Sequence, residues 1–184
     1  MICDKCEDSG YIIVDNKYVE CVCQLENKVR KYLTHYYRPT SVQYRKNFNA
    51  EKYDKTNILI DRMSEDEFKS YVKSFLLNTG MKYKHATVDT DCIFHNWWTK
   101  NQIPAYMELQ NMPFLIISLK DIIKNKFSAG VIKDLLEKRA FERNFSWIFC
   151  KFPVDSQKFY ETYSKDTAEY IQNHFQRIIT FPKK

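Results

Sequence analysis

The chain has 184 residues, 44% of them hydrophobic and 16% aromatic, which suits one domain of ordinary size with a small appendage. No apolar run reaches the length of a membrane span, so we expect no membrane partner. The net charge of +6 is compatible with nucleic acid, but it is spread along the chain. Only three glycines are present, which disfavours the glycine-rich loops that usually bind phosphate.

Four of the six cysteines lie near the start of the chain as two close pairs, Cys3 with Cys6 and Cys21 with Cys23. Two thiolate pairs separated by a chain reversal are typical of a tetrahedral metal site. Residues 11–19 between the pairs predict a small hairpin that returns the chain to the second pair. Because four thiolates leave no open coordination position, we predict a structural Zn²⁺ site and not a catalytic one.

Two disulfides are the alternative use of these four cysteines. Nothing resembling a signal peptide precedes Cys3, which favours zinc over disulfides. The two remaining cysteines, Cys92 and Cys150, lie in apolar stretches of the sequence and are predicted to be buried thiols.

The segment after the cysteines is the most basic part of the chain. Residues 24–37 have the apolar spacing of a helix that ends before Pro39. The basic residues of residues 28–46, which have four tyrosines among them, are Lys28, Arg30, Lys31, Arg38, Arg45 and Lys46. Basic and aromatic residues together are typical of a nucleic-acid surface, and equally of a solvated helix and linker. Both interpretations stay open.

From residue 57 onward, short apolar segments alternate with segments of helical spacing. The predicted strands are 57–60, 84–88, 114–117, 146–150 and 177–181. The predicted helices are 68–77, 91–99, 129–143 and 165–174. This alternation predicts an α/β domain with a doubly wound, mostly parallel sheet. The predicted domains are a zinc module at 1–25, a basic helix and linker at 26–52, and the α/β domain at 53–184.

The loop after the first core strand is where phosphates usually bind in such a sheet. Here it has no glycine and no Gly-Lys-Ser/Thr sequence. Ser64 and Glu67 have the spacing of a capping box, and Glu65, Asp66 and Glu67 place three carboxylates in the first helical turn. A triphosphate would meet occupied donors and like charge, so no nucleotide is expected.

These parts, in this order, resemble the DnaC/DnaI-type replicative helicase loaders and the related IstB-like ATPases, particularly phage versions with a cysteine-rich N-terminus. The matching stretches are 3–11, Cys21-x-Cys23, Tyr37-Arg38-Pro39, 57–60, 113–117, 131–139, 147–149 and 164–171. The resemblance implies an AAA+ or RecA-like core in which 113–117 is the Walker B strand. It also implies a cytoplasmic location in a bacterial or phage-infected cell.

The chain departs from this family at each element that handles nucleotide. Arg62 to Glu67 stand in place of the glycine-rich loop and its lysine, and Ser118 and Leu119 stand where Walker B acidic residues are expected. The sensor position and the last helix carry Cys150-Lys151 and Tyr170. Because phosphoryl transfer needs those charges in place together, we predict a catalytically inactive ATPase shell.

The resemblance implies a role in DNA replication through contact with the replicative helicase or another loader subunit, with the zinc module as a docking element. Two alternatives stay open. One is a zinc-containing regulator of phage or bacterial replication or transcription, whose hairpin and residues 28–46 contact single- or double-stranded DNA. The other is an inhibitor that mimics a loader subunit.

Overall fold

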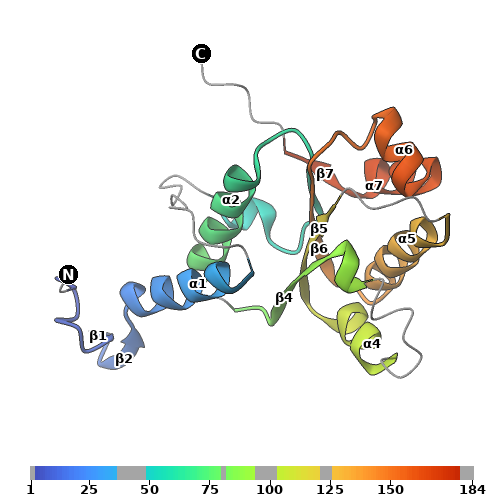
Figure 1. Ribbon diagram of the computed structural model, residues 1–184. Helices are drawn as coiled ribbons and strands as arrows, with labels where there is room; N and C mark the ends of the chain where they lie inside the picture. The colour runs from blue at the N-terminus through green and yellow to red at the C-terminus, as the bar shows by residue number, and fades with distance from the viewer. Residues whose placement is uncertain (1–2, 37–48, 80–81, 94–102, 121–125, 179–184) are drawn as a thin grey trace, which may run out of the picture. The chain divides into compact units, whose positions relative to one another are not determined.

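The computed structural model describes residues 3–36, 49–79, 82–93, 103–120 and 126–178 (Figure 1). The chain forms two compact units, one of residues 1–50 with 69–82 and one of residues 51–68 with 83–184. Helix α2 (Glu65–Asn78) therefore belongs partly to each unit. The domain boundaries predicted after residues 25 and 52 stay predictions.

The first unit opens with the predicted hairpin. Strands β1 (Tyr11–Val14) and β2 (Lys17–Glu20) pair antiparallel, and Val14 lies opposite Lys17. The two loop residues, Asp15 and Asn16, have φ angles of 50° and 58°, the left-handed backbone that two-residue hairpin loops require. Helix α1 (Val22–Tyr36) follows directly, which confirms the predicted helix after the second cysteine pair.

The second unit contains a five-stranded sheet with the order β4-β5-β6-β3-β7. Every neighbouring pair is parallel, which confirms the predicted α/β fold. The strands are β3 (Ile58–Ile60), β4 (His85–Asp89), β5 (Phe114–Leu119), β6 (Phe145–Cys150) and β7 (Gln176–Arg177). Because the first of these strands lies between the last two, the carboxyl ends of β3, β6 and β7 meet at one edge, where open α/β sheets bind ligands.

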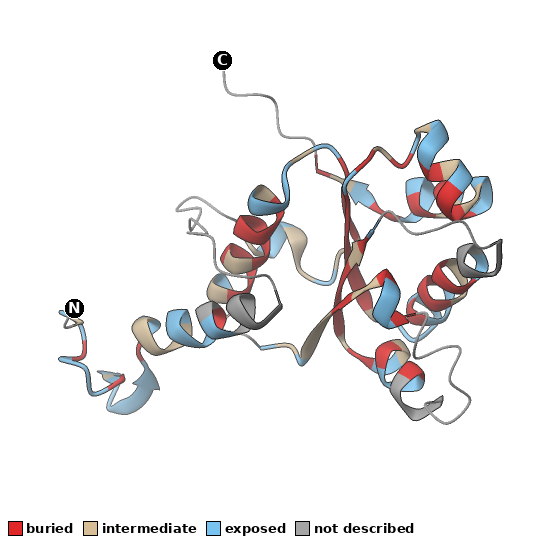
Figure 2. Ribbon diagram, in the orientation of Figure 1, coloured by how far each residue is buried: buried red, intermediate tan, exposed pale blue. Residues whose placement is uncertain are grey.

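Four helices gather on one face of this sheet (Figure 1). They are α4 (Ile103–Asn111), α5 (Lys126–Phe141), α6 (Gln157–Tyr163) and α7 (Lys165–His174), and a short 3₁₀ helix, η1 (Glu51–Tyr53), precedes β3. Apolar side chains such as Leu115, Ile148, Leu135 and Ile171 form one buried cluster between strands and helices, seen as red ribbon in Figure 2. Strand β5 has a central position, since it pairs on both edges and is buried along most of its length.

Two helices, α4 and α6, were not predicted. α6 has only seven residues and begins at the N-cap Ser156, so it offers too short a window for helical periodicity to be recognised. α4 carries Pro104 in its first turn, where proline is tolerated. Of the helix predicted over 91–99, the structure shows residues 90–93 as helical, and 94–99 lie outside the described residues. Residues 179–181 of the last predicted strand also lie outside them.

Candidate metal centre and the turn after strand β3

The sulfur atoms of Cys3, Cys6, Cys21 and Cys23 all lie within 4.8 Å of one another. The Sγ atoms of Cys3 and Cys21 are 3.8 Å apart, and those of Cys6 and Cys23 are 3.4 Å apart. Four sulfurs bound tetrahedrally at about 2.3 Å from Zn²⁺ would lie about 3.8 Å from each other, so the cluster has the size of a metal site. All four cysteines are free, and these distances are far from the roughly 2.05 Å of a disulfide.

Backbone turns place the sulfurs. The Glu7 N–H donates to the Cys3 carbonyl at 2.8 Å and closes the first turn, and the Cys21 N–H donates to the Gly10 carbonyl at 2.8 Å. Gly10 has φ of 81°, a left-handed conformation that favours glycine. Cys21 and Cys23, although only two positions apart, can both direct their sulfurs to the cluster because Cys23 already lies in the first turn of α1.

The thiols of the cluster differ in acidity. A backbone hydrogen bond from Lys5 lowers the pKa of Cys3 to about 7, which favours its thiolate. Burial raises the pKa of Cys6, and the neighbouring Cys6 sulfur raises the pKa of Cys23. Metal binding requires deprotonated thiols, so a divalent cation is the partner that would let these four sulfurs ionise together.

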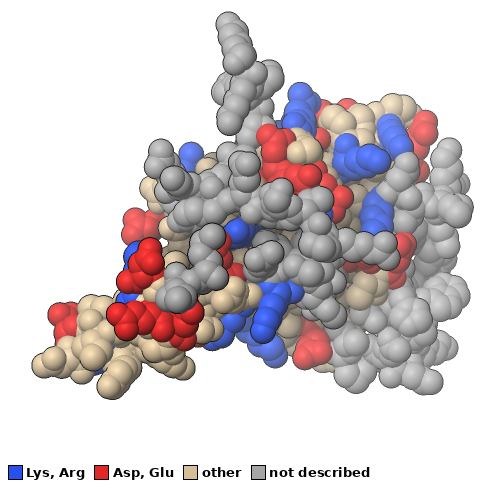
Figure 3. Space-filling model, turned by 60° about the vertical axis from the view of Figure 1, so that its left-hand side comes forward, with Lys and Arg blue, Asp and Glu red and all other residues tan. Residues whose placement is uncertain are grey.

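The hairpin between the cysteine pairs exposes an apolar surface. Of the eight large hydrophobic side chains that are exposed among the described residues, six lie within residues 11–22. They are Tyr11, Ile13, Val14, Tyr18, Val19 and Val22. Tyr18, 81% exposed, lies opposite Ile13, which is 66% exposed, so both share one face of the hairpin. Figures 2 and 3 show this surface as exposed and largely uncharged, and such patches mark interaction sites.

The turn after β3 has the predicted capping box. The Ser64 N–H donates to Glu67 Oε2 at 3.0 Å, and the Glu67 N–H donates to Ser64 Oγ at 3.3 Å. Glu65, Asp66 and Glu67 all lie in the first turn of α2, and Phe68 stacks on Phe149 of β6 at a centroid distance of 5.0 Å. Two amides at the start of this helix are therefore used by the chain itself.

Sequence reasoning missed a cluster of charged side chains at this turn, in which Asp61 is fully buried and the other three members are partly exposed. It consists of Asp61, Arg62, Asp155 and Arg177, and is called here the β3 ion cluster. Asp61 Oδ2 accepts from Arg177 Nη2 at 2.7 Å and from the Val154 N–H at 2.8 Å, and the Asp61 side chain is fully buried. Asp155 Oδ2 accepts from Arg62 Nη2 at 2.7 Å and from Arg177 Nη1 at 3.4 Å.

The β3 ion cluster fills the edge where β3, β6 and β7 end. Burial works to raise the pKa of Asp155, but Arg177 and Arg62 outweigh it and hold this pKa below its ordinary value. The second oxygen of Asp61, Oδ1, is buried and has no hydrogen-bond partner among the described residues. Charged side chains of the protein itself therefore lie at this edge of the sheet, where Asp61 and Asp155 are bonded to arginines.

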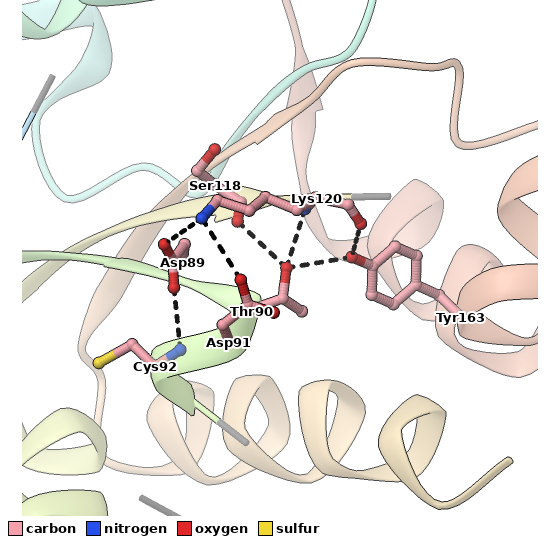
Figure 4. A network of polar contacts seen from close by, with 7 residues as sticks. All are labelled: Asp89, Thr90, Asp91, Cys92, Ser118, Lys120 and Tyr163. Carbon is pink, nitrogen blue, oxygen red and sulfur yellow. Dashed lines mark hydrogen bonds and ion pairs between the residues drawn. The ribbon is translucent and has the colours of Figure 1, made fainter. Parts of the chain in front are cut away.

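The end of β5, the expected Walker B position, carries a cation. Lys120 Nζ pairs with Asp89 Oδ2 at 2.5 Å and with Asp91 Oδ2 at 3.4 Å (Figure 4). The hydrogen bond that Lys120 donates to Asp89 raises the pKa of Lys120. Burial works to raise the pKa of Asp89, but the contacts with Lys120 outweigh it and lower this pKa. The Cys92 N–H donates to Asp89 Oδ1 at 2.9 Å, so Asp89 caps the helical residues 90–93.

Hydrogen bonds of Thr90 connect the carboxyl ends of β4 and β5 to α6. Its Oγ1 accepts from the Lys120 N–H at 2.8 Å and donates to the Ser118 carbonyl at 3.4 Å, while Tyr163 bonds both Thr90 Oγ1 and the Lys120 carbonyl (Figure 4). Leu119, which follows Ser118, is buried. The carboxylates near this end therefore come from β4 and the residues after it, and both form ion pairs with Lys120.

The two isolated cysteines differ. Cys150 is buried, as predicted, in β6. The predicted burial of Cys92 was wrong, because this residue lies on the exposed side of the helical turn that follows β4. Neither residue joins the metal cluster.

The predicted nucleic-acid residues are only partly described. Lys28 and Lys31 are exposed on α1, and Lys28 Nζ pairs with Glu20 Oε1 at 2.5 Å. The side chain of Arg30, and all of Arg38, Arg45 and Lys46, lie outside the described residues. The nucleic-acid role of this segment stays a prediction.

Comparison with known proteins gives a fold. No family model and no curated protein matches this sequence. The solved structure of DnaI matches with a TM-score of 0.53 and 10% identity over 90% of this chain and 87% of that one. A proposed primosome component from Streptococcus pyogenes serotype M3 matches with a TM-score of 0.50 and 11% identity, over 85% and 77% of the two chains.

At these identities the likeness shows the fold alone. The chain has a DnaI-like α/β fold, as the resemblance in its sequence predicted. Within the described residues, no helix has both the length and the apolar character needed to cross a membrane.

Proposed function

We propose that this protein acts in DNA replication as a loader-like protein that binds a replicative helicase or a loader subunit, without hydrolysing nucleotide. The DnaI-like fold supports the general role. The observation that carries the proposal is the filled turn after β3. The capping box, three carboxylates and the β3 ion cluster lie at this turn, and they support a protein that holds no phosphate there.

A structural Zn²⁺ at the four cysteines belongs to this proposal. The sulfur spacing fits the ion, and no open position would remain for catalysis. Bound Zn²⁺ would supply folding free energy to residues 3–23 by joining the two cysteine pairs. The chain itself would then present the exposed hairpin.

The chemistry of the hairpin supports a protein partner. Residues 3–23 contain five acidic and two basic residues, a formal charge of −3 with the cysteines neutral, in a chain of net charge +6. Phosphate-driven binding needs a basic surface, and Lys28 beside the module is already paired with Glu20. Exposed aromatic and aliphatic side chains such as Tyr18 and Ile13 are the groups that anchor protein interfaces.

Affinity capture from the native cells tests this proposal. Wild-type protein would be compared with a variant carrying Ile13→Ser and Tyr18→Ser, whose metal content is checked first. We expect a replicative helicase or loader subunit in the wild-type capture and its loss with the variant. Capture of neither class of protein, or equal capture by both proteins, would contradict the proposal.

A further inference from the structure

A second candidate interaction surface lies in the α/β unit, where the end of α4 meets α5. A groove of about 340 Å³ opens there. It is lined by Gln110, Asn111, Asp134, Glu137, Lys138, Phe141 and Glu142. No residue of the metal cluster, the β3 ion cluster or the Thr90 network contributes to it.

Buried polar bonds fix the floor of this groove. Arg139 of α5 is 1% exposed and donates to the carbonyls of Leu109 and Met112, at 2.5 and 2.8 Å, and to that of Phe145 at 2.6 Å. Its guanidinium thereby caps the carbonyl end of α4, where positive charge is favoured. The groove thus lies between two helices that are bonded together.

The rim of the groove is acidic. Its lining has three carboxylates and one ammonium group, which sum to −2 in a chain of net charge +6. Lys138 Nζ pairs with Asp134 at 3.0 Å, and Lys133 approaches Glu137 at 3.8 Å. Glu142 forms no ion pair among the described residues. Glu137 and Glu142 therefore keep most of their capacity to bind a cationic group.

Apolar side chains are exposed on the same two helices. Phe141, the last residue of α5, is 86% exposed, and Met107 of α4 is 50% exposed. Outside residues 11–22, these two are the only large hydrophobic side chains that are exposed among the described residues. An exposed phenylalanine beside partly exposed carboxylates is suited to a partner with an apolar side chain flanked by cationic ones.

We propose that the α4–α5 groove docks a basic segment of a partner protein, in which Lys or Arg residues flank a large apolar side chain. Charge complementarity selects this occupant: the rim attracts cationic side chains and repels nucleic acid. Phe141 and Met107 would contact the apolar side chain, and Glu137 and Glu142 would bind the cations. This surface is separate from the hairpin, so either one can fail without the other.

A pair of synthetic peptides tests the groove on the purified full chain. The first places Lys and Arg around a central Leu-Trp, and the second has Glu at each basic position. Binding is measured by calorimetry, and its location by amide chemical shifts. The variants are Phe141→Ser and the double change Glu137→Gln with Glu142→Gln. The control variant is Glu169→Gln on α7, which removes an exposed carboxylate elsewhere in the same unit.

We expect the basic peptide alone to bind, with shifts at α4 and α5. Removing two rim carboxylates should weaken binding about fivefold, and Phe141→Ser about thirtyfold, because exposed rim charges contribute less to binding than a phenylalanine that the partner buries. Glu169→Gln should leave affinity unchanged. Binding of both peptides, shifts elsewhere, a single-stranded oligonucleotide that shifts the same amides, or self-association that Phe141→Ser abolishes would each overturn the proposal.

Discussion

The cysteine module and the end of β3 differ in which side chains they expose and which they bury. In residues 3–23, the sulfurs converge on one point while apolar side chains such as Tyr18 are exposed. At the end of β3, charged side chains turn inward, and the fully buried Asp61 is bonded to Arg177 and to a backbone amide. In the first region, sulfurs and apolar side chains remain available to a metal ion or a partner protein. In the second region, almost all charged groups are already bonded within the chain.

This difference indicates where a DnaI-like chain without a phosphate loop keeps its capacity to bind. An exposed apolar surface gains free energy when a partner covers it. A buried ion pair gains nothing from an incoming anion, which would have to displace a carboxylate first.

Metal removal should have the largest effect, and only on the first region. Structural Zn²⁺ in small modules contributes about 10–16 kcal/mol of binding free energy, so chelation or Cys6→Ser should unfold residues 3–23. The sheet of the second unit should persist. Amide chemical shifts and metal content by mass spectrometry measure both effects.

The matched control is Cys92→Ser, which removes an exposed cysteine outside the cluster. It should leave one metal ion per chain. A protein that keeps its hairpin amide shifts after complete chelation would show that the metal does not organise this region.

Breaking the β3 ion cluster should come next. Arg177→Met leaves Asp61 buried without its ion pair, at an expected cost of about 3–5 kcal/mol in unfolding free energy. Adding Asp61→Asn to the same variant should recover part of this loss, because the uncompensated charge disappears. Urea denaturation of each variant measures the differences.

Arg62→Met serves as the control within the cluster. Arg62 is half-exposed, and its one ion pair with a described residue is that with Asp155, so its removal should cost less than about 1 kcal/mol. Equal losses of unfolding free energy for Arg62→Met and Arg177→Met would contradict the claim that the cluster stabilises the fold through the buried Asp61.

These regions also differ in how far the sequence predicts them. The cysteine pairs, the hairpin and the capping box of Ser64 and Glu67 are formed by residues close along the chain, so spacing alone indicates them. The β3 ion cluster joins Asp61 to a residue 116 positions away. Only the order of the strands brings such residues together, and no local pattern records that order.

The same limit applies to the ends of β4 and β5. The acidic pair Asp89 and Asp91 stands out in the sequence. Its ion pairs with Lys120, however, form only because β4 pairs with β5. The hydrophobic pattern predicts the strands well because buried parallel strands are continuous apolar runs. It missed α6 because seven residues make fewer than two helical turns.

Loss of the N-cap of α2 should have a smaller effect. Ser64→Ala removes the acceptor of the Glu67 N–H and should lower unfolding free energy by about 1 kcal/mol. Ser64→Thr keeps a hydroxyl acceptor and should stay near wild type. If both substitutions cost the same in urea denaturation, the hydroxyl is not what stabilises this turn.

The smallest effect is a pH dependence at Asp155. Its pKa is lowered in the folded state, so its contribution to stability is present above the unfolded value of about 3.9 and is lost as pH falls through the folded pKa. The difference in urea midpoint between wild type and Asp155→Asn should therefore be constant above about pH 5 and should shrink toward pH 3. A difference that grows as pH falls would contradict the assignment.

Nucleotide binding to the purified, zinc-loaded protein tests the central claim most directly. Calorimetric titration with ATP and Mg²⁺, followed by a phosphate-release assay with single-stranded DNA, measures binding and turnover. The filled turn after β3 predicts no saturable heat and no release above the buffer rate. Saturable binding that Ser64→Ala or Arg177→Met alters, or hydrolysis stimulated by DNA, would contradict it.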